Sequence, residues 1–226
     1  MSEDDLLETN RDGSTSLNAM FVMISSSRDS EKAAGIKNGG GVFSLALLET
    51  LKESESSNLS WFELIERIRT KVKEKGFSTQ LPQLSCSRPL NVFDPFTIVP
   101  KRKKDDAKRH RKRAILVGIN YVDQPDIQLT GCHNDVLNMQ KYLVEKHGFD
   151  ERDMALFLDD GKHYAPTKEN IEKAFDIISM QSDPGDVVFF HYAGHGRQYE
   201  DIDGTLNLLL FAFVLSLECF SQASQL

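Results

Sequence analysis

The chain has 226 residues, 40% hydrophobic and 27% charged, and carries a formal net charge of −7. This composition is typical of a globular protein with one large α/β domain or two small ones. The acidic balance argues against nucleic acid as a partner. Three scattered cysteines exclude a disulfide framework or a paired metal motif, which favours a cytoplasmic, reducing location.

The chain begins with an acidic leader, a strand and a helix. Residues 1–18 lack the basic and then apolar layout of a signal peptide, and we expect them to be disordered. Residues 19–25 (AMFVMIS) predict a buried strand, because they are apolar and serines end them. Residues 42–54 predict a helix, since their valine and leucine side chains recur at helical spacing.

A second helix follows, with signals at both of its ends. Ser60 and Glu63 form a capping box, and Gly76 occupies the position of a C-terminal cap. The helix carries one apolar stripe, made of Trp61, Leu64, Ile65, Ile68 and Val72. Prolines punctuate residues 80–96, which predicts extended chain there.

Residues 101–113 (KRKKDDAKRHRKR) contain no apolar residue except Ala107. Such a run is expected to stay solvated, so we interpret it as a linker between a first block, residues 19–100, and a second block, residues 114–204. Its two basic clusters leave a nuclear-localisation signal, and hence a nuclear location, open as an alternative.

The second block alternates strands with helices. Strands are expected at residues 114–120 and 154–160 and before HYAGHG (191–196), and helices at residues 132–149 and 167–181. This order implies a parallel sheet with helices on both faces. Ligand sites in such sheets lie beyond the carboxyl ends of the strands, which is where HYAGHG falls.

The last apolar segment, residues 206–217 (LNLLLFAFVLSL), is too short to cross a membrane. A spanning helix needs roughly 20 apolar residues. We therefore expect a buried strand or helix and no membrane partner, with an artefactual or disordered tail as the alternative.

The two histidines of HYAGHG differ in their expected roles. His191 continues the alternation of its strand, which favours a hydrogen-bonded core residue. His195 lies between Gly194 and Gly196, past the strand, where a loop can present its imidazole for acid–base chemistry. The residues alone leave a capping or metal-binding role for His195 equally open.

Several segments resemble the metacaspases, the caspase-like cysteine peptidases of protists, fungi and plants. FFHYAGHGRQ is similar to their histidine segment, and RAILVGINY with GCHND is similar to their large-subunit-like region. FVMISSSRDSEKA, FELIERIRTKVKEKGF and PQLSCSRPLNVFDPF resemble the small-subunit-like region. The resemblance implies an incomplete caspase-like three-layer α/β fold with a mostly parallel sheet. The small-subunit-like region comes first, as in type III metacaspases, and residues 205–226 form a non-family tail.

The resemblance also implies the roles of the site residues. The family includes endopeptidases that cleave polypeptides after Arg or Lys. His195 would be the general base, and the Gly196 amide would belong to the oxyanion hole. Asp135 would pair with the basic side chain of the substrate, with Cys132 and Ala193 lining the pocket. Simple helix capping is a compatible role for Asp135. Ala193 replaces a residue that is often serine in relatives.

One departure from the family affects activity. The segment that carries the nucleophilic cysteine in relatives has no counterpart, so we expect the chain as written to be inactive. Cys132 and Cys219 are weak replacements, and Cys86 is expected to be structural. The calcium-binding stretch of many relatives is reduced to Asp201 and Asp203, so we expect no metal and no other cofactor. The alternatives are a non-catalytic protein that binds basic peptides or partner protomers, and a truncated product without function.

Overall fold

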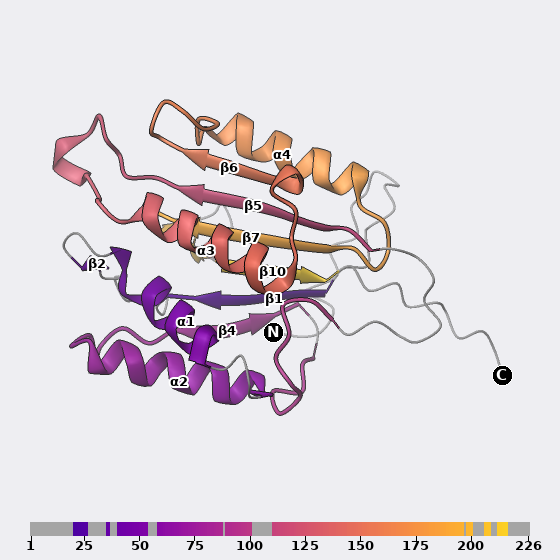
Figure 1. The fold of residues 1–226 in the computed structure, drawn as a ribbon. Helices are drawn as coiled ribbons and strands as arrows, with labels where there is room; N and C mark the ends of the chain where they lie inside the picture. Colours follow the sequence, from indigo (N-terminus) through magenta and orange to yellow (C-terminus); the bar gives the residue numbers. More distant parts are fainter. Residues whose placement is uncertain are drawn as a thin grey trace.

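The computed structural model describes residues 20–26, 35–36, 40–53, 58–87, 89–100, 110–196, 198–200, 206–208 and 212–216. Within these residues, six strands form one sheet in the order β4-β1-β10-β7-β5-β6 (Figure 1). They are β1 (Met20–Ser25), β4 (Gln83–Cys86), β5 (Lys112–Gly118), β6 (Met154–Leu158), β7 (Val187–Ala193) and β10 (Ala212–Ser216). Short strands β2 (Gly35–Ile36), β3 (Gly40–Gly41), β8 (Gln198–Glu200) and β9 (Leu206–Leu208) pair outside this sheet.

Four of the six strands run in the same direction. β5 pairs in parallel with both β6 and β7. β10 is antiparallel to β7 and to β1, so β1 runs the same way as β7. Only β10 and β4, which is antiparallel to β1, run the opposite way. The predicted α/β class with a mostly parallel sheet is therefore confirmed.

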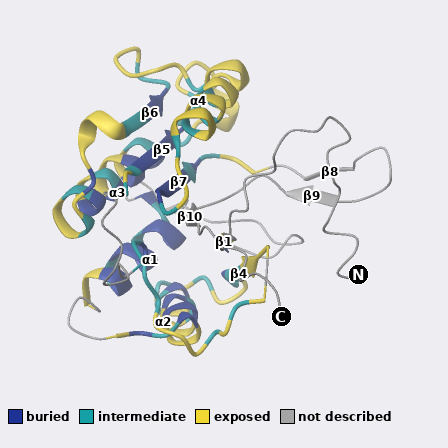
Figure 2. Ribbon diagram, turned by 90° about the vertical axis from the view of Figure 1, so that its right-hand side faces the viewer, coloured by how far each residue is buried: buried dark blue, intermediate teal, exposed yellow. Residues whose placement is uncertain are grey.

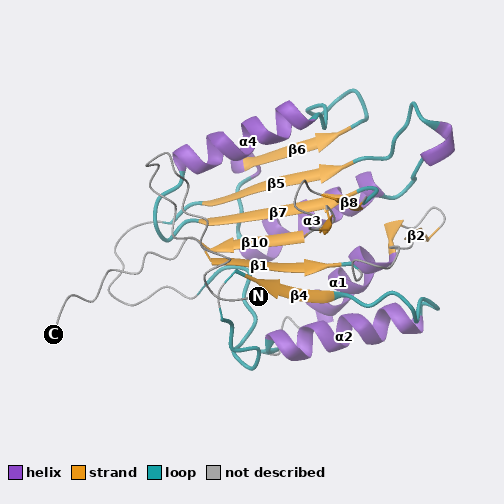
Figure 3. Ribbon diagram, turned by 180° about the vertical axis from the view of Figure 1, so that it is seen from behind, coloured by secondary structure: helices purple, strands orange, loops and turns teal. Residues whose placement is uncertain are grey.

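Helices cover both faces of the sheet, which gives the predicted three layers. α1 (Val42–Glu53), α2 (Trp61–Glu74) and α3 (Cys132–His147) share a core with one face. α4 (Lys168–Gln181) lies over β5 and β6 on the other face (Figure 3). β5 is buried from both sides, because Leu116 contacts the three-helix core and Val117 contacts the α4 core. Figure 2 shows β5 and β7 buried, with the outer side of α4 exposed.

The capping box predicted for α2 is present. The Ser60 hydroxyl accepts a hydrogen bond from the Glu63 amide at 3.2 Å, and the Glu63 carboxylate accepts one from the Ser60 amide at 2.8 Å. Gly76, just past the end of the helix, has a φ of 93°, the left-handed conformation expected of a C-terminal cap.

The apolar run 206–217 contributes strands β9 and β10 within its described residues. β10 occupies the position between β7 and β1, so this part of the run is a strand, one of the two structures expected for it. Among the described residues, no helix has the length and hydropathy required to span a membrane.

β5 begins at Lys112 and so takes in the end of the expected linker. Arg113 is buried, and its guanidinium donates to the Asp186 carboxylate and to the Gln181 carbonyl, each at 2.8 Å. The expectation of a solvated run does not hold at this end, because a buried carboxylate pairs with the arginine. Residues 101–109 lie outside the described residues.

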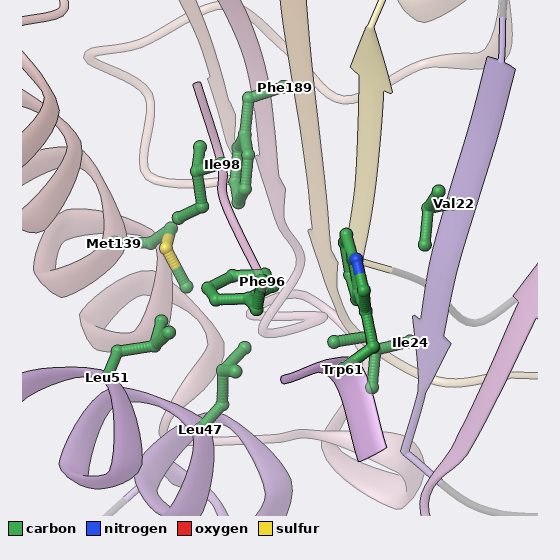
Figure 4. Close-up of a pocket in the computed structure, with 9 residues that line it drawn as sticks. All are labelled: Val22, Ile24, Leu47, Leu51, Trp61, Phe96, Ile98, Met139 and Phe189. Carbon is green, nitrogen blue, oxygen red and sulfur yellow. The ribbon is translucent and has the colours of Figure 1, made fainter. Parts of the chain in front are cut away.

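The two predicted blocks share one core. The cluster on the three-helix face joins Leu64 of the first block with Leu116 of the second. An apolar cavity of about 20 Å³ lies in this core (Figure 4). Its lining comes from both blocks: Val22, Ile24, Leu47, Leu51, Trp61, Phe96, Ile98, Met139 and Phe189. Because this lining is aliphatic and aromatic, the cavity is a gap in packing and lacks the groups needed for catalysis.

Candidate active site

His195 follows the end of β7, at the edge where the parallel strands β5, β6 and β7 all end. The residue is exposed, and its Nε2 lies 2.6 Å from the carbonyl oxygen of Ile127, in the short 3-10 turn η2 (Pro125–Ile127). A carbonyl oxygen only accepts, so Nε2 carries the proton of the neutral ring. Nδ1 is then the nitrogen that can accept a proton from a reacting group.

Two tyrosines hold the backbone and ring of His195. The rings of Tyr121 and His195 lie 4.8 Å apart between centroids, and the Tyr192 hydroxyl donates to the His195 carbonyl at 3.0 Å. Burial, and then the hydrogen bond with Tyr121, raise the pKa of Tyr192, so its hydroxyl stays protonated. Gly194 leaves room for this fold-back, since a Cβ there would lie 2.7 Å from the Tyr192 hydroxyl oxygen.

A carboxylate at the end of β6 binds the turn that carries Tyr121. Asp159 accepts hydrogen bonds from the amides of Asn120 at 2.8 Å and Val122 at 3.2 Å, and from His133 Nε2 at 2.5 Å. Burial acts to raise the pKa of Asp159, but these hydrogen bonds outweigh it and lower that pKa below its ordinary value. Asp159 is therefore ionised at neutral pH. Tyr121 has a φ of 55°, a conformation uncommon for any residue but glycine.

Asp135 lies on α3 and is only 3% exposed. Its Oδ2 accepts a hydrogen bond from the Gly41 amide at 2.8 Å, directly before α1, and the Ser44 side chain also bonds it. Burial raises the pKa of Asp135 to about 6, against the lowering effect of these bonds. Asp135 thus caps α1 of the first block. Its own helix begins at Cys132, whose amide donates to Asn120 Oδ1 at 3.0 Å. The expected capping role therefore applies to a different helix.

The contact between Asp135 and α1 depends on a close approach of the two blocks. A Cβ on Gly131 would lie 2.2 Å from the Cα of Gly40, so the two backbones touch there. Any side chain at Gly131 would push the blocks apart at this point.

The described cysteines do not supply an activated thiol. Cys132 is buried, and burial, followed by the charges of Asp135 and Asp159, raises its pKa to about 12, so the thiol stays protonated at neutral pH. Cys86 is exposed on β4, which is separated from β7 by three strand spacings, about 14 Å. Cys219 lies outside the described residues.

The remaining predicted residues lie along or after β7. Ala193 is its buried last residue, and Gly196 is exposed next to His195. His191 is 1% exposed, and neither ring nitrogen has a hydrogen-bond partner among the described residues. The core position expected for His191 is therefore correct, but the hydrogen bonds expected for its ring are not present among the described residues. Burial lowers the pKa of His191 to about 4, so the ring is neutral.

Within the described part of the chain, no group of three or more His, Cys, Asp or Glu side chains is arranged to bind a metal ion. Asp201 and Asp203, the expected remnant of a calcium site, lie outside the described residues.

Sequence reasoning missed several residues around His195. Ile127 acts through its backbone carbonyl, which leaves no side-chain signature. Tyr121 and Tyr192 act through packing and a main-chain contact that only the folded loops create. Asp159 could have been found, because it lies at the end of the predicted strand 154–160, whose carboxyl end belongs to the same edge as HYAGHG.

Comparisons with known proteins agree with this architecture. Residues 3–93 match the caspase domain family model, and residues 112–210 match the model described as metacaspase, peptidase C14 domain. Metacaspase III c of Phaeodactylum tricornutum is 36% identical over 202 residues, 83% of this chain and 58% of that protein. Metacaspase-1B of Aspergillus fumigatus is 45% identical over 96 residues, 42% of this chain and 23% of that protein. Metacaspase-1 of Sclerotinia sclerotiorum is 46% identical over 96 residues, 42% of this chain and 22% of that protein.

The three-layer fold, the histidine beyond β7 and the two family matches define a protein of the caspase-like peptidase class. Within that class, the chain belongs to the metacaspase family. It spans 58% of the length of Metacaspase III c, and smaller shares of the two fungal relatives.

Proposed function

We propose that this fold carries the histidine half of a cysteine endopeptidase site. A thiolate would attack the peptide carbonyl, His195 Nδ1 would hold the thiol proton, and the protonated ring would pass it to the leaving amine. Water would then hydrolyse the thioester. The Gly196 amide, in the exposed loop after His195, would donate to the oxyanion. The observation that carries the proposal is the contact from Nε2 to the Ile127 carbonyl, which leaves Nδ1 basic.

We further propose that Asp135 selects substrates with Arg or Lys before the cleaved bond, with Cys132 and Ala193 lining the pocket. A buried carboxylate can bind a guanidinium through two charge-assisted hydrogen bonds. The substrate would compete with the Gly41 amide and Ser44, which bond the carboxylate here. Because burial raises the pKa of Asp135 to about 6, basic peptides should bind more weakly as the pH falls below that value.

The third part of the proposal is that these 226 residues alone do not turn over peptides. Two observations support it. The Cys132 thiol is buried and protonated, and Cys86 lies on a distant strand. β10 ends at Ser216 beside Val187, about 20 Å along β7 from the end that His195 follows. Cys219 comes three residues after Ser216, and three residues of chain span at most about 11 Å, so Cys219 falls short of that end of β7.

Peptide hydrolysis tests the active-site proposal. The 226-residue chain is compared with a chimera that carries the nucleophile segment of a metacaspase after residue 204. Fluorogenic peptides ending in Arg are measured with and without calcium, beside matched peptides ending in Gln. We expect turnover of the Arg peptide by the chimera alone, and a loss of about 10²–10⁴-fold in its His195→Ala variant. If the unmodified chain cleaves the Arg peptide and Cys219→Ala abolishes that turnover, the proposed inactivity of the 226-residue chain is contradicted.

A non-catalytic protein that binds basic peptides is the second candidate, favoured by the protonated state of the Cys132 thiol. Calorimetric titration of the 226-residue chain with an Arg peptide separates the two functions. Binding that Asp135→Asn abolishes, together with an inactive chimera, would support the binding protein. If the chain is folded but gives no heat of binding with the peptide, the peptide-binding function is rejected.

A further inference from the structure

A path of contacts leads from the end of β6 to the ring of His195. It begins at Asp159, passes through the turn at Tyr121 and ends at the imidazole. We propose that Asp159 is a positioning residue, which holds the loop between β5 and α3 in the shape that orients His195. This inference rests on the proposed role of His195 as general base.

The first step is the hydrogen bonding between the Asp159 carboxylate and the turn at Tyr121. The two oxygens of Asp159 accept from the amides of Asn120 and Val122, which flank Tyr121 on either side. Tyr121 has a φ of 55°, which is strained for a residue with a side chain. Such a conformation persists only where its surroundings determine it, and the two flanking hydrogen bonds do so. His133 in the first turn of α3 in turn holds the Asp159 carboxylate.

The second step is that one loop supplies both contacts to the imidazole. The ring of Tyr121 packs on His195, and the carbonyl of Ile127 accepts from its Nε2. Hydrogen bonds within the loop join these two points, from the Gln124 amide to the Tyr121 carbonyl at 2.9 Å and from the Ile127 amide to the Gln124 carbonyl at 3.1 Å. Displacing the turn at Tyr121 therefore moves both contacts together.

The next residue along the chain provides a matched control. Asp160 also bonds a histidine, since His163 Nδ1 lies 2.8 Å from its carboxylate, and it also accepts from backbone amides. Those amides belong to Lys162 and His163, in the turn that Asp160 itself begins. Of the two neighbouring aspartates, only Asp159 accepts hydrogen bonds from the described residues of the loop that contacts His195.

The test follows the ring nitrogens of His195 by ¹⁵N NMR in the 226-residue chain, which requires no turnover. In the parent chain we expect the neutral ring to hold its proton on Nε2. Asp159→Asn should lower the preference for this tautomer about five-fold, as expected for the loss of one ordinary hydrogen bond, and Asp160→Asn should leave it unchanged. Identical His195 signals in the two folded variants would overturn the proposal.

Variants of Tyr121 keep the proposal testable if Asp159→Asn fails to fold. Tyr121→Gly accepts the positive φ but removes the ring, so the fold should survive while the tautomer preference falls. Tyr121→Phe keeps the ring and should retain the preference. Unchanged His195 signals in Tyr121→Gly would also reject the path.

The chimera separates this inference from the proposed function. If His195 responds to Asp159→Asn but the chimera cleaves nothing, the positioning role stands and the peptidase function fails. If the chimera is active and its Asp159→Asn variant keeps its kcat, with the tautomer unchanged, the positioning role fails alone.

Discussion

Two buried titratable side chains, Asp135 and His191, make opposite contributions to the pH dependence of stability. Burial raises the pKa of Asp135 to about 6 and lowers the pKa of His191 to about 4. In the unfolded chain these values return to about 3.9 and 6.5. Between pH 4 and 6 the folded state therefore holds an extra proton on Asp135 and lacks one on His191. The two effects oppose each other, so the parent chain should show little net slope in this range.

The Asp135→Asn variant isolates the contribution of His191 to the pH dependence of stability. In the parent chain, stability contributed by protonated Asp135 is present below pH 4 and is lost as the pH rises through 6, a change of about 3 kcal/mol. Without that loss, the free energy of unfolding of the variant should rise with pH between 4 and 6. Urea unfolding at a series of pH values measures the slope. A variant with the same flat profile as the parent chain would contradict the buried state of Asp135.

The His191→Leu variant isolates the contribution of Asp135 to the pH dependence of stability. The neutral ring stabilises the fold only above its unfolded pKa of about 6.5, and protonation in the unfolded state removes this stability as the pH falls to 4. The leucine variant should therefore lose stability with rising pH between 4 and 6. It should also be about 1–3 kcal/mol more stable at pH 5, because it removes two buried nitrogens that have no hydrogen-bond partner among the described residues. A destabilised variant with an unchanged slope would show that the ring finds partners.

At the scale of single elements, the N-terminal cap of α2 offers a local test. Ser60→Ala removes the hydroxyl that caps the Glu63 amide and should cost about 1 kcal/mol of unfolding free energy. Glu74→Ala, on the exposed side near the other end of the helix, is the matched control and should change stability by less than about 0.5 kcal/mol. Thermal unfolding of both variants measures the difference, and equal melting temperatures would argue against the cap.

The sequence predicts elements well where their determinants are local. The capping box of α2 and the apolar runs of β5 and β7 are each written within a few residues, and all are present. The cap of α3 comes from Asn120, twelve residues earlier, so local pattern could not find it. Arg113 departs from the expected solvated linker because its partner, Asp186, is distant in sequence. The same limit applies to the site. The local motif HYAGHG marks His195, but Ile127 contacts His195, and Asp159 binds the loop that carries Ile127, only in the folded chain.

At the scale of the whole molecule, one core joins the two blocks, so the linker need not be continuous. We expect residues 1–100 and 110–226, expressed as separate chains, to associate and to elute together. Met139→Ala in the second chain should weaken the association, because Met139 is fully buried against the first block. Met180→Ala, 86% exposed on α4, should not. Size-exclusion chromatography of the mixed chains measures this, and two separate peaks would contradict a shared core.

The direction of β10 determines where the chain leaves the sheet. Its last residue, Ser216, pairs with Val187, at the amino ends of the parallel strands, whereas His195 follows their carboxyl ends. A fluorophore or affinity tag joined behind this strand thus starts from the side of the sheet opposite the imidazole. Such a label can report folding or immobilise the protein without crowding an incoming peptide.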